Sequence, residues 1–232
     1  MTSDSQMRRH FHEELDQLQK QLLEMAGLVE QSLARATDGL GTGAKVDVEA
    51  VKLADERIDE LEIDIDERVM ELLALHQPMA SDLRQIITTS KISNDLERIG
   101  DHAVNIARAT HRMRNAHPVE TSRELSDMVE VTREMVSDSL AAYVSRNPST
   151  ARMVCVTDDR VDDLRRSLFR ILVTHMLEDP KRISAALELL LISQNLERAA
   201  DLATNIAEDV VFLVEGRSIK HGAEAAHQAP DD

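Results

Sequence analysis

The sequence predicts an all-α protein built as two tandem antiparallel three-helix bundles that are related by internal duplication. Three observations lead to this prediction. Apolar residues recur at helical spacing along the chain, with no sustained alternation. Glycine and proline are scarce, at seven and five residues, and most of them lie between the periodic segments. Long motifs of the first half return in the second half.

Six helical segments follow from the positions of the residues that break helices. The stretch GLGTG at residues 39–43 and the prolines Pro78, Pro118, Pro148 and Pro180 divide the chain. Helices of roughly 40–50 Å, joined by short loops, pack as antiparallel bundles. In chain order, we expect helices at Gln6–Asp38, Val46–Leu75, Ser81–Asn115, Glu120–Arg146, Ser149–Glu178 and Lys181–Glu215.

The internal repeat gives the domain boundaries. SNDLERIGDHAVNIA at residues 93–107 returns as SQNLERAADLATNIA at 193–207, with nine of fifteen positions identical. DERIDEL at residues 55–61 returns as DDRVDDL at 158–164, with an offset of 103 rather than 100. We therefore expect a first bundle at residues 6–115 and a second at 120–215. Residues 216–232 are polar, small and without pattern, which predicts a disordered tail.

The charge and composition exclude several classes of protein. The formal net charge is −16, and no basic patch interrupts it, so nucleic acid is not an expected partner. The chain has a single cysteine, Cys155, and cannot form an internal disulfide, which suits a reducing compartment. No apolar run is long enough for a signal peptide or a membrane span. We expect a cytoplasmic protein with no direct membrane insertion.

A polar stripe runs along the third helix of each half. On a helical wheel its members fall within about 60° of their mean direction, opposite the apolar face. Glu97 and Asp101 are like charges four residues apart, which disfavours a helix slightly, yet the second half keeps the same choice. A merely solvated face has no reason to keep it. The stripe consists of Asn94, Glu97, Arg98, Asp101 and Asn105, and the matching polar positions in the second half include Glu197, Arg198, Asp201 and Asn205.

The second helix of each half carries another pair of carboxylates with the same spacing. Asp55 and Asp59 form the first pair, and Asp158 and Asp162 form the second. Two such pairs on facing helices gather four carboxylates, which is costly unless a cation neutralises them. Oxygen-only ligands suit hard ions such as Mg²⁺, Mn²⁺, Ca²⁺ or iron. A network without metal, in which Arg98 and Arg198 offset the charge, remains an alternative.

A ferritin-like oxidase or a metal-storage protein is the rival function. The oxidase needs Glu-x-x-His pairs that point into a bundle, and the chain has one such pair, Glu224–His227, within the expected tail. His102 follows Asp101, but Leu202 stands at the matching position. We interpret His102 as a helix-surface histidine and find no arrangement of residues that would act as a nucleophile, so we expect a protein without enzymatic activity.

Together, the two copies of both motifs and the opening LLEMAGLVEQSLARA resemble the PhoU family of phosphate-transport accessory proteins over about residues 11–215. The resemblance implies a cytoplasmic, dimeric protein of two three-helix bundles. It implies an adaptor between a phosphate ABC transporter, through its ATPase subunit, and a sensor histidine kinase. Such an adaptor restrains phosphate uptake and keeps the phosphate-starvation response off when phosphate is plentiful.

The resemblance also implies a metal site in each half. Iron, zinc, manganese or magnesium would be held in the first half by Asp55, Asp59, Glu97 and Asp101, and in the second half by Asp158, Asp162, Glu197 and Asp201. Asn94, Arg98, Asn105, Arg198 and Asn205 would then support the ligands from the same helix faces. In the second half ERAAD replaces the ERIGD of the first, but all four carboxylates are kept.

Overall fold

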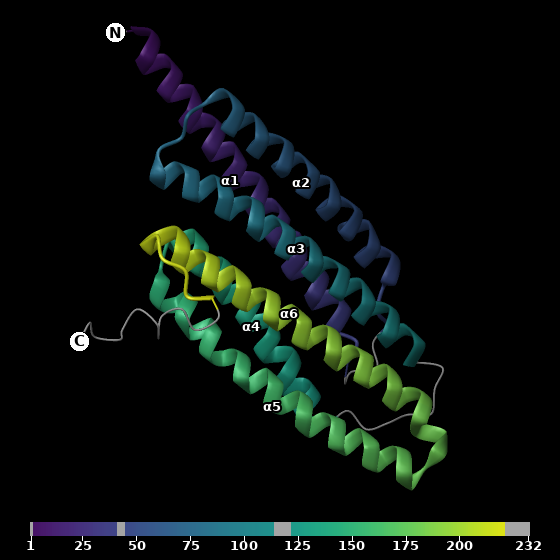
Figure 1. Ribbon diagram of the computed structural model, residues 1–232. Helices are drawn as coiled ribbons and strands as arrows, with labels where there is room; N and C mark the ends of the chain where they lie inside the picture. The colour runs from purple at the N-terminus through teal and green to yellow at the C-terminus, as the bar shows by residue number, and fades with distance from the viewer. Residues whose placement is uncertain (1, 41–44, 114–121, 221–232) are drawn as a thin grey trace, which may run out of the picture.

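The computed structural model describes residues 2–40, 45–113 and 122–220, and this part of the chain is helical with no strand. The predicted all-α fold is therefore confirmed (Figure 1). The helices begin and end within a few residues of the expected bounds. They are α1 (Thr2–Thr37), α2 (Val48–Leu75), α3 (Ala80–Met113), α4 (Arg123–Ser145), α5 (Pro148–Glu178) and α6 (Ile183–Glu215), with a short 3-10 helix, η1 (Pro180–Arg182), before α6.

Capping side chains explain where several helices begin and end. The Asp47 side chain accepts a hydrogen bond from the Ala50 backbone N–H at the start of α2. The Asn147 side chain accepts hydrogen bonds from two backbone N–H groups at the start of α5. Pro148, at the first helical position, has no N–H that would need a partner. Gly216 ends α6 in the left-handed region, with φ of 70°, which glycine adopts without steric cost.

The six helices form two three-helix bundles that pack side by side. Helices α1, α2 and α3 contact one another, and so do α4, α5 and α6. The closest association of all joins α3 to α6, so these two helices lie in the middle of the molecule, with α2 and α5 on the outside (Figure 1). The internal duplication is therefore visible as two similar halves that meet along α3 and α6.

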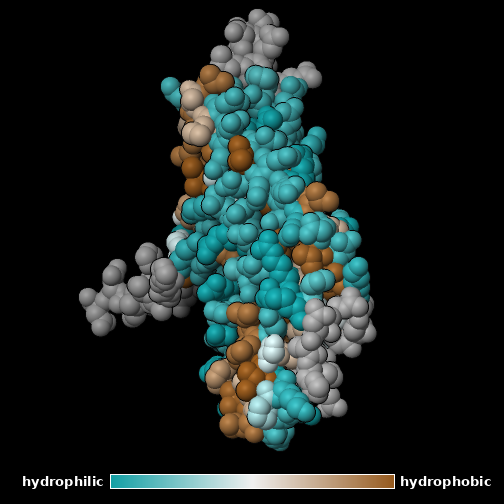
Figure 2. All heavy atoms as spheres, turned by 90° about the vertical axis from the view of Figure 1, so that its right-hand side faces the viewer, coloured by the Kyte–Doolittle hydropathy of each residue, from teal (hydrophilic) through white to brown (hydrophobic). Residues whose placement is uncertain are grey.

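The face of the molecule in Figure 2 is mostly hydrophilic, in keeping with the formal net charge of −16. On this face hydrophobic side chains gather in separate patches, one of them at the end where α5 turns into α6. Within the described residues, no helix is long and apolar enough to cross a membrane.

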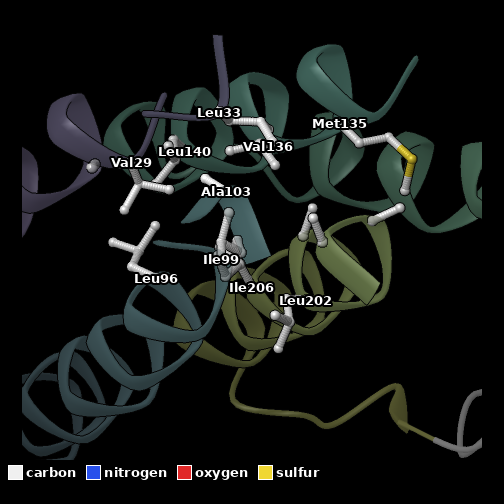
Figure 3. Packing of buried hydrophobic residues seen from close by; sticks show 14 of the residues in the cluster. Val29, Leu33, Leu96, Ile99, Ala103, Met135, Val136, Leu140, Leu202 and Ile206 are labelled. Atoms are coloured by element: carbon white, nitrogen blue, oxygen red, sulfur yellow. The ribbon is translucent and has the colours of Figure 1, made fainter. Parts of the chain in front are cut away.

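A single hydrophobic core connects the two bundles. Buried residues from all six helices form one continuous cluster. Figure 3 shows its centre, where side chains from α1, α3, α4 and α6 converge. The labelled residues are Val29, Leu33, Leu96, Ile99, Ala103, Met135, Val136, Leu140, Leu202 and Ile206. Because the same apolar side chains stabilise both halves, we expect the two bundles to hold each other in place.

Polar contacts between α3 and α6 fix the relative position of the two helices. The Arg112 guanidinium donates to both carboxylate oxygens of Glu188, at 2.8 and 2.7 Å. Asp209 is 2 % exposed, and its Oδ1 atom lies 3.3 Å from the ammonium groups of both Lys91 and Lys220. A carboxylate buried to this degree needs such partners, because burial without them is costly.

The folded chain continues past the expected end of the second bundle at residue 215. Ile219 packs against the hydrophobic core, and Lys220 pairs with Asp209. The predicted disordered tail at 216–232 thus begins with residues that are held in place, because an apolar and a basic side chain both find partners on α6 or the core. Residues 221–232 lie outside the described part of the chain.

Candidate metal centre

The first carboxylate cluster forms where α2 packs against α3. Asp55 and Asp59 lie one turn apart on α2, and Glu97 and Asp101 lie one turn apart on α3. The Oδ1 atom of Asp55 is buried and lies beside Gly100 of α3. A Cβ atom at Gly100 would be 2.9 Å from it. The absence of a side chain at Gly100 therefore makes room for Asp55.

The electrostatics show that the four carboxylates lie near enough for their charges to act on one another. Burial, followed by the charges of Asp59, Asp101 and Glu97, raises the pKa of Asp55 to about 6. Burial, followed by the Asp101 charge, also raises the pKa of both Asp59 and Glu97. Arg108 offsets only part of this repulsion at Asp55. At neutral pH this site holds more negative charge than its protein surroundings compensate.

The second cluster repeats this arrangement between α5 and α6. Burial raises the pKa of Asp158, with a further contribution from the charge of Asp162. Burial also raises the pKa of Asp201, followed by the charges of Asp158 and Asp162. Glu197 belongs to the same group, since Asp201 and Asp162 act on it, but Arg165 approaches it and donates a hydrogen bond of 3.4 Å. The second cluster is therefore partly neutralised by a basic residue.

The two clusters differ at the point where the helices touch. Ala200 of α6 stands where α3 has Gly100, so the second half accommodates a methyl group at that point. In the first half, Asp55 Oδ1 is buried and has no hydrogen-bond partner. An unsatisfied buried carboxylate oxygen is rare in proteins and calls for a partner such as an ion.

Four of the five predicted supporting residues line a cleft between the two clusters. The cleft has a volume of about 430 Å³ and lies between α3 and α6. Residues from matching positions of the two repeats line it in pairs, so it lies where the two halves meet. The pairs are Arg98 and Arg198, Asp101 and Asp201, His102 and Leu202, and Asn105 and Asn205. Asn94 is exposed on α3 and does not line this cleft.

His102 is not the helix-surface histidine that the sequence suggested. It is half-buried, and its Nδ1 atom lies 3.0 Å from Asn195 Oδ1 on α6. Burial lowers the pKa of His102, which favours the neutral imidazole. His102 follows the exposed Asp101 on α3, and the packing of α6 against this side of α3 covers it.

The residues of the first cluster suit a hard cation in their chemistry. All donors are carboxylate oxygens, they carry excess negative charge, and one buried oxygen has no partner. Within residues 2–40, 45–113 and 122–220, however, no three carboxylate, histidine or cysteine side chains lie close enough together to form a metal site as they stand. Binding of an ion would therefore require carboxylate side chains to turn inward, which exposed Asp59 and Asp101 are free to do.

Two acidic residues on α2 beyond the repeated motif also approach the first cluster. Burial, then the charges of Asp66 and Asp59, raises the pKa of Glu62, and the Glu62 charge in turn acts on Glu97. Asp66 accepts a 2.9 Å hydrogen bond from Ser90 of α3. Glu62 and Asp66 continue, at intervals of about one helical turn, the row of acidic residues that starts with Asp55 and Asp59. This spacing could have identified them from the sequence. The Glu-x-x-His pair of the rival function, Glu224–His227, lies outside the described residues.

Comparison with known proteins finds the same domain family in both halves of the chain. The PhoU domain family matches residues 22–110 and again residues 125–210. The phosphate-specific transport system accessory protein PhoU homolog of Clostridium acetobutylicum is 35 % identical over 91 % of this chain and 97 % of that protein. The homolog of Aquifex aeolicus, which has the same name, is 38 % identical over 90 % of this chain and 94 % of its own length.

Two solved structures have the same fold. The crystal structure of PhoU from Pseudomonas aeruginosa superposes with a TM-score of 0.85 at 37 % identity, and covers 89 % of this chain and all of that one. The phosphate transport system regulatory protein PhoU from Streptococcus pneumoniae superposes with a TM-score of 0.82 at 28 % identity, over 90 % of this chain and 99 % of that one.

We expect alanine to have opposite effects at two helical glycines. Gly27→Ala should raise the free energy of unfolding by about 0.5–1 kcal/mol, because no atom lies within 4 Å of the new methyl group and alanine favours a helix. Gly100→Ala should lower it by about 1–2 kcal/mol, because the methyl group meets Asp55 and also Ile58, at 3.3 Å. Urea unfolding in EDTA measures both, and an equal gain from the two substitutions would show that Asp55 does not occupy this position.

Asp55→Asn should stabilise the metal-free protein at pH 7.5 but not at pH 4. The folded chain raises the pKa of Asp55 from 3.8 to about 6, so ionisation is penalised above pH 6. The penalty disappears as the pH falls from about 6 to 4, because the folded chain then takes up the proton. The gain at pH 7.5 should be on the order of 1–3 kcal/mol, measured by urea unfolding in EDTA. Asp64→Asn, at an exposed position of the same helix, is the control and should change little.

Proposed function

The chain belongs to the PhoU family, and from this premise we propose that it is an accessory regulator of phosphate transport. In this proposal it restrains phosphate uptake and keeps the phosphate-starvation response off when phosphate is plentiful. It acts without turnover, as a cytoplasmic adaptor between the ATPase subunit of a phosphate ABC transporter and a sensor histidine kinase. The observation that carries the proposal is the match of the family to both halves of the chain, over nearly the full length of the named relatives.

We further propose that each half holds one or more metal ions at its carboxylate cluster. Asp55, Asp59, Glu97 and Asp101 would hold the first, and Asp158, Asp162, Glu197 and Asp201 the second. A bound ion would neutralise the carboxylates and connect α2 to α3, or α5 to α6. The unsatisfied Oδ1 atom of Asp55 and the raised pKa of its neighbours support this proposal for the first half. Iron, zinc, manganese and magnesium all accept carboxylate oxygen ligands.

The same face of the molecule offers a surface to partners. The cleft between α3 and α6 places Arg98, Arg198, Asn105 and Asn205 between the two carboxylate clusters. These side chains are exposed or half-buried and carry hydrogen-bond donors on an otherwise acidic face. We propose that this face, in its metal-loaded form, contacts the transporter or the kinase, and that the protein acts as a homodimer.

The metal proposal predicts a metal content that depends on the first cluster. Purified wild-type protein should contain a near-integral amount of one metal by elemental analysis, and Glu97→Ala/Asp101→Ala should lose a large part of it because two of the four ligands are gone. The helical content, measured by circular dichroism, should not change. Glu130→Ala/Glu134→Ala is the matched control, because it removes an exposed pair of glutamates with the same spacing on α4. Equal trace amounts in all three proteins would contradict a metal site.

The regulatory proposal predicts a defect in cells that lack the protein. Deletion of the gene should raise the activity of a phosphate-starvation reporter in phosphate-replete medium, because the kinase would no longer be restrained. A plasmid copy of the wild-type gene should restore repression. Reporter activity that stays low in the deletion strain would reject the proposed role, whatever the metal content of the purified protein.

A further inference from the structure

A second groove lies further along the outer side of the second bundle. It has a volume of about 500 Å³ and runs between α5 and α6. Its walls combine apolar and basic side chains, chiefly Phe169, Leu190, Arg165, Arg166 and Arg170. None of these residues belongs to the carboxylate motif, so the proposed metal site does not account for the groove.

The apolar part of the groove is unusually exposed. Phe169 is one of three phenylalanines in the chain, and 53 % of it is accessible to solvent. On α6, Leu187 is 51 % exposed and lies one turn from Leu190. Ile183 and Leu191, one turn on either side of Leu187, are exposed as well. Of these residues, Ile183 lies where α5 turns into α6, and Figure 2 shows hydrophobic side chains gathered at that end of the molecule. Several exposed apolar side chains on one stretch of α6, beside an exposed phenylalanine of the groove, are typical of a site of interaction.

The three arginines of the groove have few partners within the protein and can form further hydrogen bonds and ion pairs. The Arg170 side chain makes no hydrogen bond or ion pair with any of the described residues, and the side-chain bond at this residue is one that its backbone carbonyl accepts from the Thr174 hydroxyl. Arg166 pairs with Asp163 at 2.7 Å, but both side chains are largely exposed, so this pair contributes little stability. Arg165 reaches Glu197 only at 3.4 Å. Three guanidinium groups at the edge of one groove stand out in a chain of net charge −16.

The internal repeat shows that this groove is particular to the second half. With the offset of 103 that relates the motifs of α2 and α5, residues 165, 166, 169 and 170 correspond to residues 62, 63, 66 and 67. Those positions are occupied by Glu62, Ile63, Asp66 and Glu67. The duplicated halves therefore carry opposite charge at the same place, although both keep the carboxylates of the motif. The surroundings of the motif have diverged while the motif itself has not.

We propose that the groove between α5 and α6 binds an amphipathic helix of a partner protein, with leucine-like side chains against Phe169, Leu187 and Leu190 and with acidic residues facing Arg166 and Arg170. The proposal rests on the adaptor function proposed above, for which it supplies a docking surface. The stretch from Ile183 to Gln194 spans roughly 16 Å of α6, which matches about three turns of a bound helix. Helices bind in this way through apolar residues three or four positions apart.

The charge distribution favours an acidic peptide over an anionic membrane. The three arginines attract carboxylates through charge-assisted hydrogen bonds, for which the guanidinium geometry is well suited. A flat membrane surface would also approach the acidic remainder of the chain and be repelled by it. A helix contacts the concave groove alone.

The test uses a synthetic probe and the intact protein. The probe is a fluorescein-labelled, 18-residue helical peptide with leucine at every third or fourth position and glutamate beside it. A second peptide has lysine in place of every glutamate. Fluorescence anisotropy should detect binding of the glutamate peptide to wild-type protein, and added salt should weaken this binding. Binding should be about tenfold weaker in Arg166→Glu/Arg170→Glu and in Phe169→Ser. The matched control is Arg123→Glu/Arg160→Glu, which changes the net charge equally at exposed positions outside the groove and should bind as wild type does.

Several outcomes would overturn the proposal. One is no binding of the glutamate peptide to wild-type protein, and another is equal binding by the groove variants. A third is that phosphatidylglycerol vesicles, or inorganic phosphate in competition, bind the groove in place of the peptide. These results are separate from the proposed function: a deletion strain that loses repression, together with absent peptide binding, rejects the groove and retains the regulator. Low reporter activity in the deletion strain, together with peptide binding, rejects the proposed regulatory role and retains the groove as a peptide-binding site.

Discussion

The packing of α3 against α6 is the contact on which the rest of the molecule depends. Buried side chains of these two helices, among them Ile99, Ala103, Leu202 and Ile206, converge with residues of α1 and α4 in a single core (Figure 3). The Arg112–Glu188 ion pair and the buried Asp209 with its two lysines hold the same contact in register. Because α3 and α6 each have one face in this core, their polar faces emerge together and form one cleft.

The carboxylate clusters are placed where they weaken the fold in the absence of a counterion. Asp55 is the clearest case, since it is partly buried, the charges of three other carboxylates act on it, and one of its oxygens has no hydrogen-bond partner. A protein under selection for stability alone would replace it. The continuous core that joins all six helices stabilises the chain enough to tolerate this arrangement. Local instability of this kind is common at functional sites, and the exposed Asp59 and Asp101 leave the cluster free to rearrange.

The two halves show which features survived duplication and which changed. The carboxylates at α2 and α3 are repeated at α5 and α6, but their contacts are not identical: Gly100 has become Ala200, and Arg165 now approaches Glu197. One turn further along, Glu62, Asp66 and Glu67 correspond to Arg165, Phe169 and Arg170. The molecule therefore has two similar centres with different surroundings.

The sequence by itself determined the helices, the duplication and the eight carboxylates, because each follows from spacing along the chain. Helical periodicity and the few breakers gave all six helices to within a few residues, and the repeat identified Asp55, Asp59, Glu97 and Asp101 with their counterparts. Only the tertiary structure decided how the halves meet. The pairing of α3 with α6, the burial of His102 beside Asn195 and the two lysines on Asp209 join residues far apart in the chain, and no local pattern encodes such contacts. The groove between α5 and α6 likewise exists only because these two helices lie side by side, which brings Phe169 and Leu190 into the same groove.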